Sequence, residues 1–174
     1  MKKVLMFGLL TLFGIALFAQ GGTGYISILP GYQFSSGDVD SNFVASLDGG
    51  YFFNDYWGLH MGVIYNEGKF DFGEILLPTV PPVLSDLEYK DSFYIFEIGP
   101  ELAKEIGNGQ IYWQIVNLGH TFGAEDNQWS YGTAAGYRYH FNDKWGVNCQ
   151  AAYHRVDDWD TDHWDVRVGL TFKF

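Results

Sequence analysis

The last ten residues of the chain alternate strictly between apolar and polar side chains. Successive side chains of a β-strand point to opposite faces, so this alternation predicts a strand with one apolar and one polar face. In a water-soluble sandwich the apolar face would point inward, whereas in a transmembrane barrel it would meet lipid and the charged residues would line the interior. The apolar positions are Val166, Val168, Leu170, Phe172 and Phe174, and the other face holds Asp165, Arg167, Gly169, Thr171 and Lys173.

Runs of strand length, separated by polar or by glycine- and proline-rich breaks, continue along the chain and predict an all-β fold. There are eight runs, and bacterial single-chain barrels require an even number. We therefore predict an eight-stranded antiparallel up-and-down transmembrane β-barrel. The orientation of the run at 110–122 stays open because both of its faces are mixed. The runs cover 23–34, 42–53, 57–66, 89–105, 110–122, 128–141, 145–155 and 163–174.

The predicted connections alternate between tight turns and longer loops. The turns at 54–56, 107–109 and 142–144 consist mainly of residues that favour turns, such as Asn, Asp and Gly. The other connections are longer or more acidic, which is the asymmetry expected between the periplasmic turns and the surface loops of an outer-membrane barrel. These predicted surface loops span 35–41, 67–88, 123–127 and 156–162.

The sequence FNDYWG at 53–58 recurs as FNDKWG at 141–146, an offset of 88 residues. This offset corresponds to four predicted strands, so the copies should lie on opposite sides of the barrel. Aromatic residues bracket each turn, where a belt at the membrane surface would place them. Eight tilted strand residues rise roughly 20 Å, close to the thickness of an outer membrane, and a soluble lipocalin-like barrel would not need such a belt. The predicted belt consists of Tyr51, Phe53, Trp57, Tyr65, Tyr139, Phe141, Trp145 and Tyr153.

The first twenty residues have the layout of a secretory signal peptide. Lys2 and Lys3 precede an apolar run that is too short for the roughly 20 residues of a transmembrane helix, and small residues follow it. We predict cleavage after Ala19, so that residues 1–19 form the signal peptide and residues 20–174 the barrel domain.

The mature chain is acidic and contains one cysteine. Without residues 1–19 it holds 8 basic and 21 acidic residues, a formal charge of −13. Nucleic acid is therefore not an expected partner, because binding phosphates needs a basic surface. Cys149 has no second cysteine with which to form an internal disulfide.

The signal peptide, the eight amphipathic strands, the repeated aromatic turn and the terminal Phe174 resemble small outer-membrane β-barrel proteins of the OmpX and OmpA-barrel type. The resemblance covers the whole mature chain. It implies residence in the outer membrane of a Gram-negative bacterium, in contact with outer-membrane lipid. In that family a terminal phenylalanine serves as an assembly signal, which implies that periplasmic chaperones and the barrel-insertion machinery recognise Phe174.

If Phe174 faces lipid, strict alternation places a set of charged and polar residues inside the barrel. An eight-stranded barrel is narrow enough for side chains to fill it, and buried charges must be paired. We expect acids and bases to meet near the middle as an ionic plug, with a gated path for small solutes as the alternative. Glu105 is also expected inside, unless a bulge at Pro100 reverses the alternation. The predicted network comprises Asp48, His60, Glu97, Glu101, Arg138, His140, His154, Arg167 and Lys173.

Few residues suggest chemistry. Asp158, Asp160 and Asp162 alternate in an acidic stretch but lack the glycine and glutamate of an EF-hand, so they are a weak candidate for calcium. Ser92 and Ser130 have only His60 and His154 as candidate bases, which does not make a catalytic triad. We predict no catalytic residues, no cofactor and no enzymatic activity.

The predicted loop at 67–88 contains the apolar, proline-rich stretch ILLPTVPPVL at 75–84. Exposed apolar patches usually mark contact sites, although packing against the other loops would also cover this one. The leading hypothesis is a non-enzymatic structural or surface-interaction role through the surface loops, with a surface ligand at 67–88. The alternatives are a narrow channel for small or hydrophobic solutes, resembling the OmpW class, and a lipid A-modifying enzyme.

Overall fold

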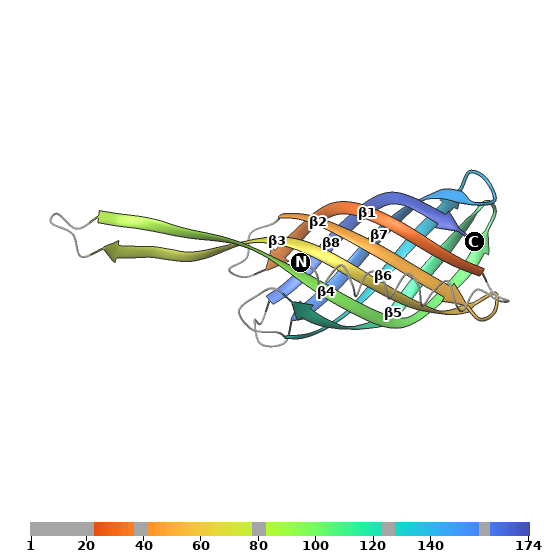
Figure 1. The fold of residues 1–174 in the computed structure, drawn as a ribbon, viewed down its shortest axis with the longest axis horizontal. Coiled ribbons are helices and arrows are strands. Elements are labelled where there is room, and N and C mark those ends of the chain that lie inside the picture. The colour runs from red at the N-terminus through yellow and green to blue at the C-terminus, as the bar shows by residue number, and fades with distance from the viewer. Residues whose placement is uncertain (1–22, 37–41, 78–82, 123–127, 157–160) are drawn as a thin grey trace.

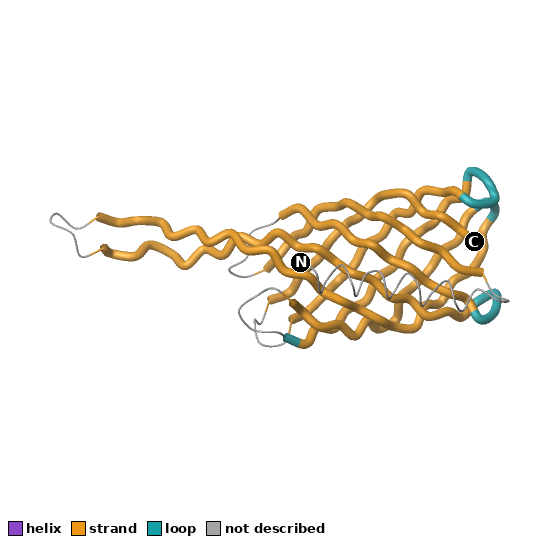
Figure 2. Tube along the Cα trace, viewed as in Figure 1, coloured by secondary structure: helices purple, strands orange, loops and turns teal. Residues whose placement is uncertain are grey.

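The computed structural model describes residues 23–36, 42–77, 83–122, 128–156 and 161–174, so the predicted signal peptide lies outside the described residues. Eight antiparallel strands follow one another around a closed barrel in which the last strand pairs with the first (Figures 1 and 2). The predicted fold class is confirmed. The strands are β1 (Thr23–Ser36), β2 (Asn42–Phe52), β3 (Trp57–Leu77), β4 (Val83–Ile106), β5 (Gly109–Phe122), β6 (Trp129–His140), β7 (Trp145–Val156) and β8 (Thr161–Lys173).

Apolar side chains cover the outside of the barrel, and polar side chains fill much of its inside. On β8, Val166 and Val168 are 50% and 46% exposed, whereas Asp165 and Arg167 are 2% and 0% exposed. This arrangement is the reverse of that in a water-soluble protein and suits a surface in contact with lipid. The alternation at the end of the chain therefore has the orientation predicted for a transmembrane barrel. Among the described residues, no helix has the length and apolar character needed to cross a membrane.

The prediction of a long loop at 67–88 is wrong. β3 continues to Leu77 and β4 begins at Val83, and the two strands form a ribbon that projects far beyond the rest of the barrel (Figure 1). We call this ribbon, residues 67–77 and 83–92, the arm. Proline cannot donate a hydrogen bond within a sheet, so the three prolines in this stretch suggested a loop. All three of them fall at 78–82, outside the described residues, so they do not interrupt the paired segments.

The two copies of the repeated sequence form the same turn. The side-chain oxygen of Asn54 accepts hydrogen bonds from two following backbone amides, both at 2.9 Å. The oxygen of Asn142 does the same at 2.9 and 2.7 Å. Asn side chains favour turns through such local bonds. The turns join β2 to β3 and β6 to β7, and the closed strand order separates them by four strands, as the offset predicted.

A β-bulge in β5 explains why the faces of that strand look mixed. The register with β4 shifts between Ile98 and Glu101, and the register with β6 shifts between Gln114 and Asn117, so the extra residue lies in β5. The residues of β5 that face inward have even numbers before the bulge, as Gln114 does, and odd numbers after it, as Asn117 does. The bulge lies opposite Pro100, which has no amide hydrogen to donate. β4 itself keeps its alternation through Pro100.

Candidate functional site

The first charged cluster in the interior centres on Arg138 of β6. Its guanidinium donates hydrogen bonds to both carboxylate oxygens of Glu101, at 2.7 and 3.1 Å. It also lies 3.5 and 3.7 Å from the ring centroids of Tyr25 and Tyr112. Glu101 accepts two further hydrogen bonds, from Tyr25 at 2.5 Å and from Gln114 at 3.3 Å. Bidentate pairing and ring stacking both favour a charged arginine at a buried position.

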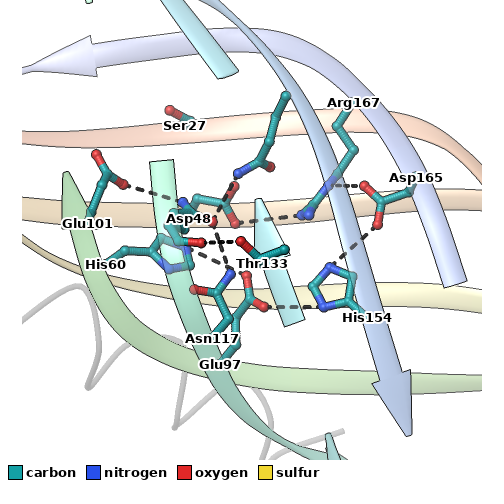
Figure 3. A network of polar contacts seen from close by, with 12 residues as sticks. Ser27, Asp48, His60, Glu97, Glu101, Asn117, Thr133, His154, Asp165 and Arg167 are labelled. Atoms are coloured by element: carbon teal, nitrogen blue, oxygen red, sulfur yellow. Dashed lines mark hydrogen bonds and ion pairs between the residues drawn. The ribbon is translucent and has the colours of Figure 1, made fainter. Parts of the chain in front are cut away.

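The second charged cluster surrounds Arg167 of β8 (Figure 3). The Nε of Arg167 donates a hydrogen bond to Asp165 at 2.6 Å, and its Nη1 lies 4.0 Å from Asp48. His154 stands between two carboxylates, with Nε2 3.5 Å from Asp165 and Nδ1 3.6 Å from Glu97. All five side chains are 3% exposed or less. They come from four different strands and form one buried group of charges.

Uncharged polar side chains occupy the space between and beside the two clusters. Gln114 accepts hydrogen bonds from Asn117 at 3.0 Å and from Gln150 at 3.2 Å. Ser27 donates to Thr171 at 2.9 Å across the seam where β1 and β8 close the barrel. The interior is therefore packed with side chains that bond across strands, as expected for a barrel this narrow.

The structure buries seven of the nine residues predicted for the interior network. Of the other two, His140 and Lys173 are only half-buried, and they line a cavity of about 510 Å³ among the tight turns that reaches Arg138. Glu105 lines the same cavity at the open end of β4, where its side chain is 73% exposed and lies 3.6 Å from Lys173. The seven buried residues are Asp48, His60, Glu97, Glu101, Arg138, His154 and Arg167.

The sequence analysis missed several interior partners and expected one central cluster where there are two. Asp165 was placed on the polar face of its strand but was not included in the network. Its position two residues before Arg167, on the same face, was the available signal. Tyr25 and Tyr112 are buried in the interior, and the sequence analysis had assigned them to neither face. Gln114 could not be assigned because of the bulge in β5.

Two of the interior histidines, His60 and His154, contact carboxylates. His60 Nε2 lies 3.6 Å from Glu97, and both ring nitrogens of His154 face carboxylates. A serine nucleophile would need a histidine nitrogen free to take its proton, and both ring nitrogens of His154 face carboxylates. Asp48, His60 and Glu97 instead bring atoms that could bind a metal within 4.8 Å of one another.

The aspartates considered for calcium lie only in part within the described residues. Asp158 and Asp160 lie outside them. Asp162 accepts a hydrogen bond from Tyr153 at 2.8 Å and lies 3.6 Å from Arg155. Asp162 is therefore paired with side chains of the neighbouring strand β7.

The residues of the predicted aromatic belt lie on the outer surface. Those beside the two repeated turns are well exposed, with Phe53 at 66%, Trp57 at 47%, Phe141 at 55% and Trp145 at 45%. Tyr139 is 47% exposed, and the remaining members are partly exposed. Their function as a membrane belt stays a prediction.

The terminal residue lies at the seam that closes the barrel. The Phe174 amide donates to the Gly24 carbonyl at 3.0 Å, and the Gly24 amide donates to the Phe174 carbonyl at 2.9 Å. The last residue thus continues the pairing of β8 with β1. Its function as an assembly signal stays a prediction.

Several small outer-membrane barrels of known structure share this fold. Ail, the attachment invasion locus protein of Yersinia pestis, is 18% identical with a TM-score of 0.57, and the match covers 89% of this chain and 100% of that one. Neisserial surface protein A (NspA) is 16% identical with a TM-score of 0.56, covering 88% and 100%. The N-terminal barrel domain of Pseudomonas aeruginosa OprF is 12% identical with a TM-score of 0.55, also covering 88% and 100%. At these identities the similarity concerns the fold alone.

The sequence itself matches one protein family. No curated protein sequence matches the chain. Residues 5–172 match the family described as outer membrane protein beta-barrel domain. The closed antiparallel sheet, the apolar outer face and the polar interior agree with that match. The chain therefore belongs to the outer-membrane β-barrel protein family and resides in the outer membrane of a Gram-negative bacterium.

Proposed function

We propose that this barrel is a non-enzymatic surface-interaction protein and that its arm contacts the partner. The observation that carries the proposal is the length of the arm. β2 pairs with β3 only as far as Asn66, and β5 pairs with β4 only as far as Tyr94. Beyond these residues, and among the parts of the chain that the structure describes, β3 and β4 pair only with each other, and their pairing continues to Leu77 and Val83. The eleven residues of β3 in the arm span about 35 Å at the usual rise of a strand.

The arm is a two-stranded ribbon with two open edges. Such a ribbon is at best marginally stable in water when nothing packs against it. Open strand edges also present unpaired backbone groups, to which another chain can add a strand. Contact with a partner would therefore stabilise the arm, and binding would use the arm and not the filled interior.

Charge along the arm favours a basic partner. Residues 67–92 contain six acidic and two basic residues. The register pairs Asp71 with Glu88 and Glu74 with Asp86. Like charges at directly opposite positions disfavour pairing, so a cationic surface would relieve this cost. A crystal structure of Ail contains a heparin analogue, sucrose octasulfate. A polyanion of that kind does not suit the acidic arm of this chain.

The interior supports binding over transport or catalysis. A narrow channel would need a path past Arg138 and Arg167, and these side chains are 1% and 0% exposed. A lipid-modifying hydrolase would need an accessible histidine with one nitrogen free to take a proton, whereas both ring nitrogens of His154 face carboxylates and His60 is 0% exposed.

Replacing residues 68–91 with a two-residue Asn-Gly turn is expected to weaken binding to cationic surfaces. The variant and the wild type would be placed in nanodiscs, and their binding to immobilised poly-L-lysine and to heparin would be measured by biolayer interferometry. We expect the wild type to bind poly-L-lysine at least about tenfold more tightly than the shortened protein, a difference of about 1.4 kcal/mol. Neither protein should bind heparin.

A second variant separates charge from length. Replacing Asp71, Glu74, Asp86 and Glu88 with their amides keeps the length of the arm and removes the opposed acids. It should lose poly-L-lysine binding as the shortened protein does, while both variants keep the heat-dependent gel shift of a folded barrel. Equal binding by the wild type and the shortened protein would refute the arm as the contact site.

A further inference from the structure

The buried charges of the interior do not balance. Among the residues that the structure describes, the buried carboxylates are Asp48, Glu97, Glu101 and Asp165, and the buried guanidinium groups are Arg138 and Arg167. Arg138 is bound to Glu101, and Arg167 is bound to Asp165 at 2.6 Å. This leaves Asp48 and Glu97 without a closely bound cation. An uncompensated buried charge is costly, so the site needs positive charge from another source.

Three side chains converge at this position from neighbouring strands. The register places Asp48 of β2 opposite Gly62 of β3, and Gly62 opposite Glu97 of β4, while His60 lies two residues from Gly62 on the same face. Figure 3 shows Asp48, His60 and Glu97 directed toward one another. Within the described residues, no carboxylate oxygen of Asp48 or Glu97 and neither ring nitrogen of His60 makes a hydrogen bond. All three side chains are at most 2% exposed.

Gly62 leaves a space that these three residues surround. A methyl group added at Gly62 would lie 2.8 Å from Oδ1 of Asp48, 3.3 Å from Nε2 of His60 and 3.4 Å from Oε1 of Glu97. The three atoms therefore face a common point that is free of side-chain atoms only because residue 62 is glycine. One ligand atom of each residue lies within 4.8 Å of the other two. Bonds from Zn²⁺ to nitrogen and oxygen are about 2.0–2.2 Å long, so small side-chain movements toward a point between the three atoms, above the Cα of Gly62, would complete the contacts.

We propose that Asp48, His60 and Glu97 bind a divalent transition-metal ion, with Zn²⁺ as the best match, in the space over Gly62. A 2+ charge matches the two carboxylates that lack a close cation. Ca²⁺ and Mg²⁺ prefer oxygen ligands alone, whereas an imidazole ligand suits Zn²⁺ and its neighbours in the transition series. His154 contacts the second oxygen of Glu97 at 3.6 Å and is held in turn by Asp165, as outer-shell groups orient the ligands of metal sites. Because the ligands are buried, the ion enters as the barrel folds.

The test measures metal bound during folding. The tag-free mature chain would be unfolded in chelator, refolded into detergent micelles with Zn²⁺, washed with EDTA and analysed for zinc by mass spectrometry. We expect one zinc ion per folded wild-type chain. Refolding with Co²⁺ should give the visible absorption bands of a cobalt ion bound by nitrogen and oxygen. Both readouts use the wild type, so a variant that fails to fold does not leave the proposal undecided.

Variants locate the ion. Glu97→Gln removes a ligand, and Gly62→Ala fills the space while keeping every ligand. Each variant should retain at least about tenfold less zinc than the wild type. Even changes outside the first shell of ligands cause losses of that size at metal sites. Glu101→Gln is the matched control, because it removes an equally buried carboxylate four residues further along β4 that is bound to Arg138. It should retain zinc wherever it folds, and Glu105→Gln, on the exposed end of the same strand, should retain it fully.

Two outcomes would overturn the proposal. Wild-type protein that retains no zinc and shows no cobalt bands would mean that protons, and not a metal ion, neutralise the charge of Asp48 and Glu97. Equal zinc in the wild type, Glu97→Gln and Gly62→Ala would place the ion elsewhere, for example on the aspartates near Asp162.

Discussion

Replacing Glu101 with alanine is expected to lower the free energy of unfolding by about 3–5 kcal/mol, the range for breaking a buried ion pair from one side. Glu101 accepts both hydrogen bonds of the Arg138 fork and a third from Tyr25. Without it, Arg138 keeps one side-chain hydrogen bond within the described residues, to Gln110 at 3.0 Å, and its charge is 1% exposed. Urea titration of the refolded barrel in lipid vesicles would measure the loss.

Two comparisons show whether the loss comes from the buried pair. Glu105→Ala removes a carboxylate from the same strand, but that side chain is 73% exposed and lies 3.6 Å from Lys173. Its effect should stay within about 1 kcal/mol, as for surface ion pairs. The double variant Glu101→Leu with Arg138→Met removes both charges and should recover most of the lost stability. If Glu101→Ala unfolds at the same urea concentration as Glu105→Ala, the Arg138 cluster does not stabilise the barrel.

Gly169→Ala is expected to destabilise the seam between β8 and β1 by about 1–3 kcal/mol, the usual cost of overpacking. A methyl group at Gly169 would lie 1.9 Å from the carbonyl oxygen of Ile28 and 3.0 Å from the Cα of Leu29. Both are backbone atoms of β1, so no side-chain rotation can relieve the contact. The strands must separate at the position where the sheet closes. Refolding yield, from the heat-dependent gel shift, and urea titration would both report this change.

Val168→Ala is the matched control for this seam. Val168 is adjacent to Gly169 in β8 but faces outward and is 46% exposed. Its truncation should cost less than about 1 kcal/mol, roughly the value of the apolar groups removed. A Gly169→Ala barrel that refolds and unfolds like the wild type would show that the seam tolerates a wider spacing.

Most of the architecture could be predicted because the signals are local. The alternation from Asp165 to Phe174 determines which face of β8 is polar, and turn residues such as Asn54 and Asn142 fix where strands reverse. Export and the aromatic positions then favoured lipid over water as the outer environment. These features do not depend on knowing which residues from distant strands meet.

The features that could not be predicted depend on contacts between strands. The extra residue in β5 reverses its inward face between Gln114 and Asn117, and nothing in a rule of strict alternation marks that position. The arm was predicted as a loop because Pro78, Pro81 and Pro82 disfavour strands, and the paired residues on either side of them were counted as part of the same loop. The split of the interior charges into two clusters follows from the stagger of the strands, which brings Arg138 to Glu101 and Arg167 to Asp48.

The central claim is that the interior is filled and that function lies outside the barrel, on the arm. The most direct test is electrical recording from the purified wild-type protein in a planar lipid bilayer. Because Arg138 and Arg167 are buried among their partners across the interior, we expect insertion without steady conductance over the full range of applied voltage. A steady, reproducible conductance from the folded wild type would contradict the account and support a transport function.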